Sequence, residues 1–255
     1  MIRGLYTAVS GMIVGETKQA IITNNIANAN TVGFKSDNLN VKNFGDVMIY
    51  NYDKIIGNRN VKNNIGSIST GSGIESVTTF FTQGVVQNTN RETDFAVQGR
   101  GFFTLNRNGK EYYSRDGHFN VNLEGNLVND MGDIVQGYDL YTGVMGPIKV
   151  GQGTISCSSE GNISVDGVER YKIAVSDFEN YDGLKKVGDN LYEGTGARRA
   201  MNYSISQKYI EKSNVNIVKE TVEMMNNNRA FESNQKVVQV IDETLGKAVN
   251  EVGKL

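Results

Sequence analysis

Residues 214–255 read "NVNIVKETVEMMNNNRAFESNQKVVQVIDETLGKAVNEVGKL", and they carry the most regular pattern in the chain. Apolar side chains recur there every seven residues, at Ile217, Met224, Phe231, Val238 and Leu245. Ile241 adds a second position of the same heptad. Such a repeat is typical of an α-helix whose apolar stripe packs against another helix. We therefore expect one long helix from about Asn214 to near the C-terminus.

The N-terminal end carries a weaker pattern of the same kind. Apolar or small side chains fall in steps of three and four along one stripe, which comprises Leu5, Ala8, Met12, Gly15, Ile22, Ile26 and Ala29. We expect a helix here that pairs with the C-terminal helix as a coiled coil. An isolated helix is marginal in water, and one partner covers only one of its sides. We therefore expect both terminal helices to become fully ordered only in an assembly.

The end of the N-terminal pattern is rich in asparagine and reads "NNIANANTVGFKS" over residues 24–36. Asparagine is a poor residue for a helix interior, but its amide can satisfy backbone groups where a helix ends, or bond to a neighbouring chain. Asn25 and Asn28 are our candidates for such contacts, and a frayed helix end is the alternative. Gly33 would permit the turn out of the helix, and Phe34 would anchor the strand that follows.

The middle of the chain changes to a pattern of short strands and tight turns. Asn108-Gly109 and Asp166-Gly167 each lie between two strand-like runs, where a two-residue hairpin needs positive φ. The expected fold class is α+β, with long terminal helices around a mainly β domain of short antiparallel strands. The expected organisation is an N-terminal helix in 1–32, an extended and irregular segment in 33–79, a β-rich domain in 80–200, a connector in 201–213 and a C-terminal helix in 214–255. Within the irregular segment, residues 40–73 leave a hairpin open as an alternative.

Composition excludes several classes of protein. The 255 residues hold 26 Lys and Arg against 28 Asp and Glu, and this balance argues against a nucleic-acid-binding face. One cysteine, Cys157, excludes an internal disulfide and a multi-cysteine metal site. No apolar run is long enough for a membrane span, and Ser10, Gly11 and Glu16 interrupt the apolar start that a signal peptide would need. We expect a soluble chain without a cleaved signal peptide.

No residue pattern indicates catalysis or cofactor binding. His118 is the only histidine, and without an identifiable partner we expect it to be a surface turn residue. Asp130 and Asp133 lack the alternation of a calcium loop, so we expect a solvated turn. The stretch "GRGFF" lacks the third glycine of a dinucleotide fingerprint. We therefore expect no enzyme activity, no cofactor, no metal and no small-molecule substrate.

Long stretches resemble a known family, the flagellar rod and hook proteins. The matching stretches are "LYTAVSGM" (5–12), "NNIANANTVGFK" (24–35), "FFTQGVVQNTNRETDFAVQGRGFFTL" (80–105), "YYSRDGHFNVNLEGNLVNDMGDIVQGY" (112–138) and "SNVNIVKETVEMMNNNRAFESNQKVVQVIDETL" (213–245). Within the family, the length, the opening "MIRGLYTA" and "IGSISTGSGIESVTTFFTQG" (65–84) are similar to the distal rod branch. Hook proteins usually have a larger central insert and proximal rod proteins are usually shorter, but both branches stay open as alternatives.

The resemblance implies a structural subunit that polymerises with copies of itself. Its terminal helices would form the inner tube of a hollow helical filament, with the β domain outside. Such proteins are exported without a cleaved signal by the flagellar type III apparatus. Implied partners are other copies of the chain, adjacent rod and hook proteins, the export apparatus and, as further candidates, ring proteins around the rod. The candidate assembly residues are Leu5, Met12, Ile22, Asn25, Ile26, Asn28, Ile217, Met224, Phe231, Val238, Ile241 and Leu245.

Two other classes of protein fit parts of the sequence. A secreted β-rich binding module would explain the glycine-rich middle, but it would not need amphipathic helices at both ends. A hydrolase on a β-scaffold would need a clustered acid and base, for which "SRDGHF" is the one faint candidate.

Overall fold

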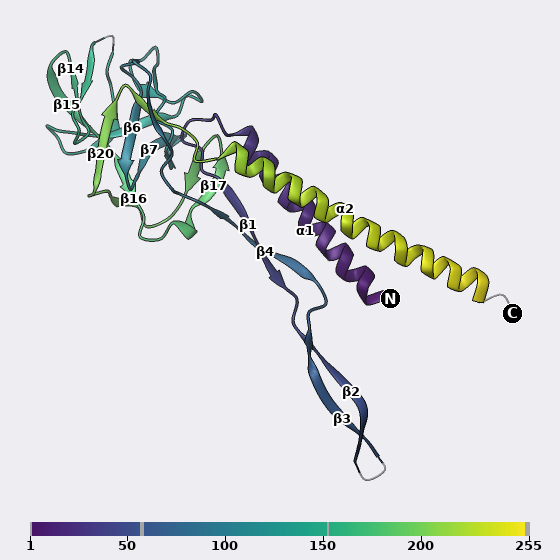
Figure 1. The fold of residues 1–255 in the computed structure, drawn as a ribbon. Coiled ribbons are helices and arrows are strands. Elements are labelled where there is room, and N and C mark those ends of the chain that lie inside the picture. Colours follow the sequence, from purple (N-terminus) through teal and green to yellow (C-terminus); the bar gives the residue numbers. More distant parts are fainter. Residues whose placement is uncertain (1, 57–58, 152, 253–255) are drawn as a thin grey trace. The chain divides into compact units, whose positions relative to one another are not determined.

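The computed structural model describes residues 2–56, 59–151 and 153–252 (Figure 1). The last three residues of the predicted C-terminal helix, 253–255, lie outside the described residues. The chain divides into two compact units. The first, which we call the helical unit, comprises Met1–Ile26, Asp37–Thr78 and Ile217–Leu255. The second, which we call the β unit, comprises Ala27–Ser36 and Thr79–Asn216. Each unit therefore combines segments that are far apart in the sequence.

Two long helices dominate the helical unit. Helix α1 spans Ile2–Ala27, and helix α2 spans Ile217–Lys247 and continues as a π-helical turn over Ala248–Val252. Both predicted helices are confirmed in type and position. Helix α2 begins three residues later than Asn214, because the Asn214 side chain is occupied in the β unit. There its Oδ1 accepts from the Ser36 N–H at 2.8 Å, and its Nδ2 donates to the Phe80 carbonyl at 2.7 Å.

The helical unit also contains four strands between Asp37 and Thr79. Strand β1 (Asp37–Asn43) pairs with β4 (Ser72–Thr79), and β2 (Val47–Ile56) pairs antiparallel with β3 (Arg59–Ile68). The sequence indicated an extended, irregular segment here with a hairpin as an alternative, and the structure has the hairpin. The segment lacks a strong pattern because every residue of β3 is exposed, and no buried face imposes an alternation of apolar and polar side chains.

The β unit is built on antiparallel pairing. Its main sheet has 13 strands in the described residues, with the path β13-β14-β15-β11-β7-β8-β18-β17, and β9, β10, β12, β16 and β19 attached to it. The bounds of these strands are β7 Phe102–Arg107, β8 Lys110–Ser114, β9 Asn120–Val121, β10 Leu127–Val128, β11 Ile134–Asp139, β12 Met145–Pro147, β13 Ile155–Cys157, β14 Asn162–Val165, β15 Val168–Ile173, β16 Val175–Asp177, β17 Lys185–Gly188, β18 Leu191–Glu193 and β19 Arg198–Arg199.

Two short sheets complete the β unit. Strand β6 (Phe95–Gly99) pairs with β20 (Tyr203–Gln207), and β5 (Val86–Asn88) pairs with β21 (Tyr209–Glu211). Residues 201–213, which we expected to be a connector, therefore contain two strands. The sequence hid them because β20 buries only Ile205 among polar neighbours.

Turns and core follow the sequence closely. Asn108 (φ 54°) and Gly109 (φ 82°) join β7 to β8, and Asp166 (φ 53°) and Gly167 (φ 81°) join β14 to β15, as predicted. The main core is a cluster of buried residues: Phe95, Val97, Phe103, Leu105, Phe119, Leu127, Val135, Ile148, Val150, Ile155, Ile163, Val165, Ile173, Val175, Leu191, Ala200 and Ile205. A second, aromatic cluster comprises Phe102, Tyr113, Phe178 and Tyr192. The β unit thus holds a core of its own.

Candidate assembly interface

Helices α1 and α2 contact each other along an antiparallel seam (Figure 1). Two glycines of α1 lie close to side chains of α2. A Cβ atom added to Gly4 would lie 3.7 Å from Ile241 Cδ1, and one added to Gly15 would lie 3.6 Å from Phe231 Cδ2. Further along α1, Lys18 Nζ lies 2.8 Å from Glu223 Oε2. Residue numbers rise along α1 as they fall along α2, so the helices run in opposite directions. Glycines on α1 allow this close approach.

Two asparagines on α2 lie in this seam, and the sequence analysis missed both. Asn227 is buried; its Nδ2 donates to the Gly15 carbonyl at 2.8 Å and to Gln19 Oε1 at 3.0 Å. The Asn234 amide lies against Gly11, where a Cβ would come within 2.8 Å of Nδ2. A signal was available, because Asn227 and Asn234 precede Ile241 by fourteen and seven residues and share its heptad position. A polar residue at such a position fixes the register of a helix pair at a cost in stability.

The proposed assembly residues fall into different environments. Ile22 and Asn25 are buried, whereas Ile217 is exposed. The structure brings Phe231 and Ile241 to the glycines of α1. The remaining members are partly buried: Leu5, Met12, Ile26, Asn28, Met224, Val238 and Leu245.

Helix α2 has a second apolar face that the helical unit leaves uncovered. Val218, Val222, Met225 and Val240 lie roughly half a turn around the helix from the seam, at 100° per residue. All four are exposed, Val218 to 74% and Val240 to 61%. Charged side chains such as Lys236 lie on the same face, between Met225 and Val240. Buried apolar surface contributes about 25 cal/mol per Å², so cover from a neighbouring molecule would still be favourable for the four apolar side chains.

The β2–β3 hairpin exposes large apolar side chains as well. These are Val47, Met48, Ile49, Tyr50, Tyr52, Val61, Ile65 and Ile68. A two-stranded hairpin on its own is marginally stable in water. The helical unit therefore exposes apolar side chains in two places, on helix α2 and on the β2–β3 hairpin.

The asparagine-rich end of α1 has a partial explanation within the chain. Asn25 Nδ2 donates to the Asp37 carbonyl at 2.8 Å, and Asn25 Oδ1 accepts from the Asp37 N–H at 3.0 Å. The amide thus acts as a strand-like partner for the start of β1. Asn28 Oδ1 accepts from the Thr31 hydroxyl at 3.1 Å. Gly33 has φ 69°, and Phe34 after it is buried, as the sequence predicted.

A buried charge cluster joins the two connecting segments of the β unit. Lys35 Nζ lies 2.5 Å from Glu211 Oε1 and donates to the Thr82 carbonyl at 2.8 Å; Lys35 and Glu211 are both fully buried. Arg115 Nη1 lies 3.3 Å from Glu211 Oε2. Backbone bonds reinforce the junction: the Gly33 N–H donates to the Glu211 carbonyl at 2.7 Å. Residues 31–36 and 211–214 are thereby locked together.

Electrostatics at this junction depend on the whole cluster. Burial lowers the pKa of Lys35, while the Glu211 carboxylate opposes that shift. Glu211 faces two cations and accepts a further hydrogen bond from the Gly84 N–H at 2.8 Å. Removal of the carboxylate would leave two like charges in a dry site. No sequence pattern indicates this cluster, because its three members are far apart along the chain.

Two smaller expectations need correction. His118 is partly buried rather than a free surface residue: its Nδ1 lies 3.0 Å from Asp94 Oδ1, and Arg91 Nη1 lies 2.8 Å from its Nε2. Asp133 is buried rather than solvated, because it holds Arg107 through both carboxylate oxygens, at 2.6 and 2.9 Å. Tertiary partners distant in sequence decide both environments.

Other reactive groups are held in unreactive states. Burial raises the pKa of the Cys157 thiol to about 12.

Among the described residues, no group of three or more His, Cys, Asp or Glu side chains is placed to hold a metal ion. No helix in the described part of the chain is long and apolar enough to cross a membrane.

Comparison with known proteins assigns the chain to a family. Three family models match: "Flagella basal body rod protein" over residues 5–35, "Flagellar hook protein FlgE/F/G D1 domain" over 96–166 and "Flagellar basal body rod FlgEFG protein C-terminal" over 206–251. The flagellar basal-body rod protein FlgG of Bacillus subtilis is 33% identical over 98% of this chain and 99% of its own length. The chain belongs to the flagellar rod and hook family.

Relatives from different branches of the flagellar family match almost equally well. FlgG of Borreliella burgdorferi is 32% identical over 98% of each chain, and the rod protein FlgF of Caulobacter vibrioides is 32% identical over the full length of each. Membership makes this chain a structural subunit of the flagellar rod rather than an enzyme. The matched regions include both helices and the centre of the β unit, so the candidate interface lies within the family's shared parts.

Proposed function

We propose that the chain builds the distal rod, a hollow helical drive shaft that transmits torque from the motor to the hook. The observation that carries the proposal is the contrast between a β unit with its own buried core and a helical unit with an uncovered apolar face on α2. That face needs an occupant, and copies of the same chain supply one at every step of a polymer. Helical polymers use heterologous contacts, in which one patch meets a different patch on the next subunit.

Within each subunit, α1 and α2 form a coiled coil in this proposal. Along α2, eight of the ten less exposed positions are spaced alternately four and three residues apart: Glu220, Met224, Asn227, Phe231, Asn234, Val238, Ile241 and Leu245. This mean spacing of 3.5 residues is that of a coiled-coil seam. Neighbouring subunits would then cover the opposite face of α2. Leu5, Met12, Ile26, Asn28 and Ile217 remain our candidates for contacts with neighbouring subunits, whereas Ile22 and Asn25 are already buried within the subunit.

The two helices (1–32 and 214–255) would line the inner tube, with the β-rich part of the chain, mainly 80–200, outside it. Residues 33–79 and 201–213 would connect them. Torque must pass through these connections, and the buried Lys35–Glu211–Arg115 cluster supports a stiff junction in the β unit. Segments ordered only in the assembly would also suit export through a narrow channel by the flagellar type III apparatus, without a cleaved signal peptide. The rod would lie beyond the cytoplasmic membrane.

The remaining partners are those that the family resemblance implies. In this proposal the segment of rod built from this chain contacts other rod proteins at one end and hook proteins at the other. Ring proteins would surround it.

FlgG and FlgF relatives have the same sequence identity to this chain, so identity does not decide between the branches of the family. The assignment to the distal rod therefore rests on the chain's length and on its resemblance to the distal rod branch. Electron microscopy of isolated basal bodies with this subunit labelled tests the branch. Label confined to the part of the rod next to the hook supports it, and label next to the motor contradicts it.

The polymer itself is tested with Leu245→Asp, which places a charge in the apolar seam. We expect loss of polymerisation by sedimentation and electron microscopy, with the thermal transition of the β unit unchanged. A deletion of residues 1–30 should have the same effect. Polymers formed normally by the Leu245→Asp protein would contradict the role of the seam.

A further inference from the structure

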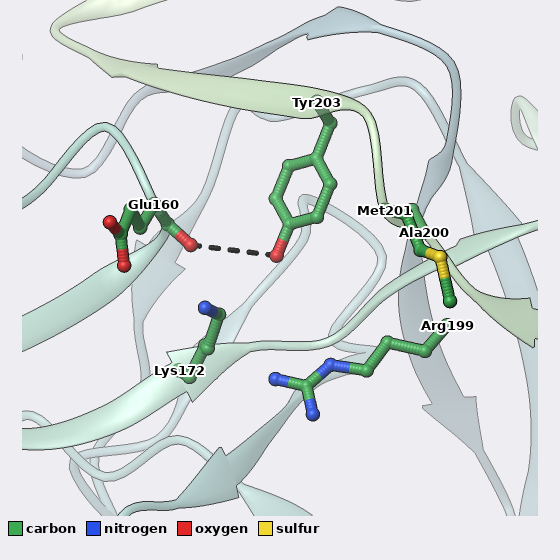
Figure 2. Close-up of a pocket in the computed structure, with 6 residues that line it drawn as sticks. All are labelled: Glu160, Lys172, Arg199, Ala200, Met201 and Tyr203. Carbon is green, nitrogen blue, oxygen red and sulfur yellow. Dashed lines mark hydrogen bonds between the residues drawn. The ribbon is translucent and has the colours of Figure 1, made fainter.

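The β unit carries a pocket that its fold and proposed assembly role leave unexplained (Figure 2). The pocket has a volume of about 350 Å³ and is lined by Glu160, Lys172, Arg199, Ala200, Met201 and Tyr203. Pockets that bind small ligands or parts of larger ones begin at about 300 Å³. The space is therefore sufficient for one or two amino-acid side chains.

Hydrogen-bond donors converge on the pocket. Figure 2 shows the Lys172 amino group and the Arg199 guanidinium on the same side of the space, below the Tyr203 hydroxyl. That hydroxyl lies 3.5 Å from the Glu160 carbonyl oxygen, a weak bond that a better acceptor could replace. Burial raises the pKa of Tyr203, so its hydroxyl stays protonated and remains a donor.

The pocket is lined by two cations and one carboxylate. Among the described residues, neither Lys172 nor Arg199 forms an ion pair, whereas the adjacent Arg198 pairs with Glu179 at 2.9 Å. Arg199 instead lies over the Tyr138 ring, 4.9 Å from its centroid. Two cations that face one space repel each other, and an anion placed between them would relieve the repulsion.

Strand pairing fixes the backbone positions of three residues that line the pocket, while the Arg199 side chain itself is exposed. Lys172 lies in β15, with Tyr138 of β11 opposite it on one side and Asn162 of β14 on the other. Arg199 lies in β19 opposite Ser176 of β16, and Tyr203 lies in β20 opposite Gly99 of β6. A site on paired strands is preorganised, which reduces the entropy lost on binding.

The walls also restrict which anion fits. Glu160 contributes one carboxylate, so a multiply charged anion such as phosphate meets repulsion as well as attraction. Met201 is 93% exposed and presents a flexible thioether beside Ala200. It can therefore pack against an apolar group of the ligand that lies next to the ligand's anionic group. We propose that this pocket binds the carboxylate of an acidic side chain, flanked by apolar residues, from a protein partner of the β unit.

The test uses the full chain at concentrations too low for polymers. The probe is acetyl-Leu-Glu-Leu-amide, with acetyl-Leu-Gln-Leu-amide and inorganic phosphate as comparisons, and binding is measured by NMR titration at low salt. We expect the glutamate peptide to bind at millimolar concentrations, about tenfold more tightly than the glutamine peptide or phosphate, since charge-assisted hydrogen bonds are the strong ones. Shifts should be confined to the residues that line the pocket.

Variants then locate the site. Lys172→Met and Arg199→Gln should each weaken binding of the glutamate peptide about tenfold. Arg198→Gln is the matched control: it removes the same charge from the same strand, and affinity should stay unchanged. Glu160→Gln should tighten binding. Equal affinity for the two peptides, stronger binding of phosphate, or an equal loss in Arg198→Gln would each overturn the proposal. None of these outcomes depends on whether the chain polymerises.

Discussion

The two units of this chain differ in how far they bury their apolar side chains. In the β unit, Phe95, Phe102 and Phe103 are completely buried, and their partners all belong to the same unit. In α2 of the helical unit, the one buried residue is Asn227, and Val218 and Val240 are open to solvent. We infer from this difference that the β unit folds around its own core, while the helical unit supplies the surface for contacts between subunits. A rod subunit needs both.

The largest effect should come from a charge on the uncovered face of α2. Val222→Asp lies away from the seam with α1, so the contacts within the subunit stay intact, but an aspartate buried between subunits costs several kcal/mol. We expect polymerisation to be abolished in sedimentation experiments. Val222→Thr, which keeps the shape without a charge, is the control. Rods of normal length from the Val222→Asp protein would show that this face is not an interface.

In the β unit, Glu211→Gln should be the most damaging single change at the charge cluster. It leaves Lys35 and Arg115 buried without their shared carboxylate, which costs about 3–5 kcal/mol of unfolding free energy. Urea denaturation of the β unit measures the loss. The matched control is Glu193→Gln, whose ion pair with Lys110 is largely exposed and should contribute far less. Similar losses in the two variants would contradict the idea that the buried cluster locks the junction.

Asp116 should make the unfolding free energy of the β unit depend on pH. Burial raises the pKa of Asp116 from 3.8 to about 6, partly offset by the hydrogen bond from the His118 N–H. The folded state therefore favours the protonated carboxyl. This contribution is fully present below pH 4 and is lost as the pH rises through 6, which lowers the unfolding free energy by about 3 kcal/mol. Asp116→Asn should remove this slope from the urea-denaturation profile. A variant that keeps the wild-type slope would show that another group is responsible.

The smallest effect tests the seam between the helices. Gly15→Ala places a methyl group 3.6 Å from Phe231 Cδ2, an ordinary contact, and alanine favours a helix over glycine by about 1 kcal/mol. Far-UV circular dichroism of the monomer should show a gain in helix. Gly11→Ala should gain less, because its methyl would displace the Asn234 amide at 2.8 Å. A larger gain from Gly11→Ala would indicate a different helix register.

The sequence predicted the elements whose periodicity is enforced by burial. The helix α2 could be predicted from its heptad spacing, and the turns at Asn108-Gly109 and Asp166-Gly167 from their residue types, because each depends on local sequence. For the exposed β2–β3 segment the sequence left a hairpin as one alternative, and the mostly polar β20 was not predicted, because no single buried face organises their side chains. Distance along the chain hid the rest. Lys35, Arg115 and Glu211 meet only after three separate segments have folded.

Amide hydrogen exchange on the full-length monomer, diluted until no polymer remains, tests the central contrast most directly. We expect amides in α1 and α2 to exchange rapidly while those of β7, β8 and β11 remain protected, and protection to spread to both helices once rods form. Slow exchange throughout α1 and α2 in the monomer would contradict the account, because the helices would then be stable without neighbouring subunits.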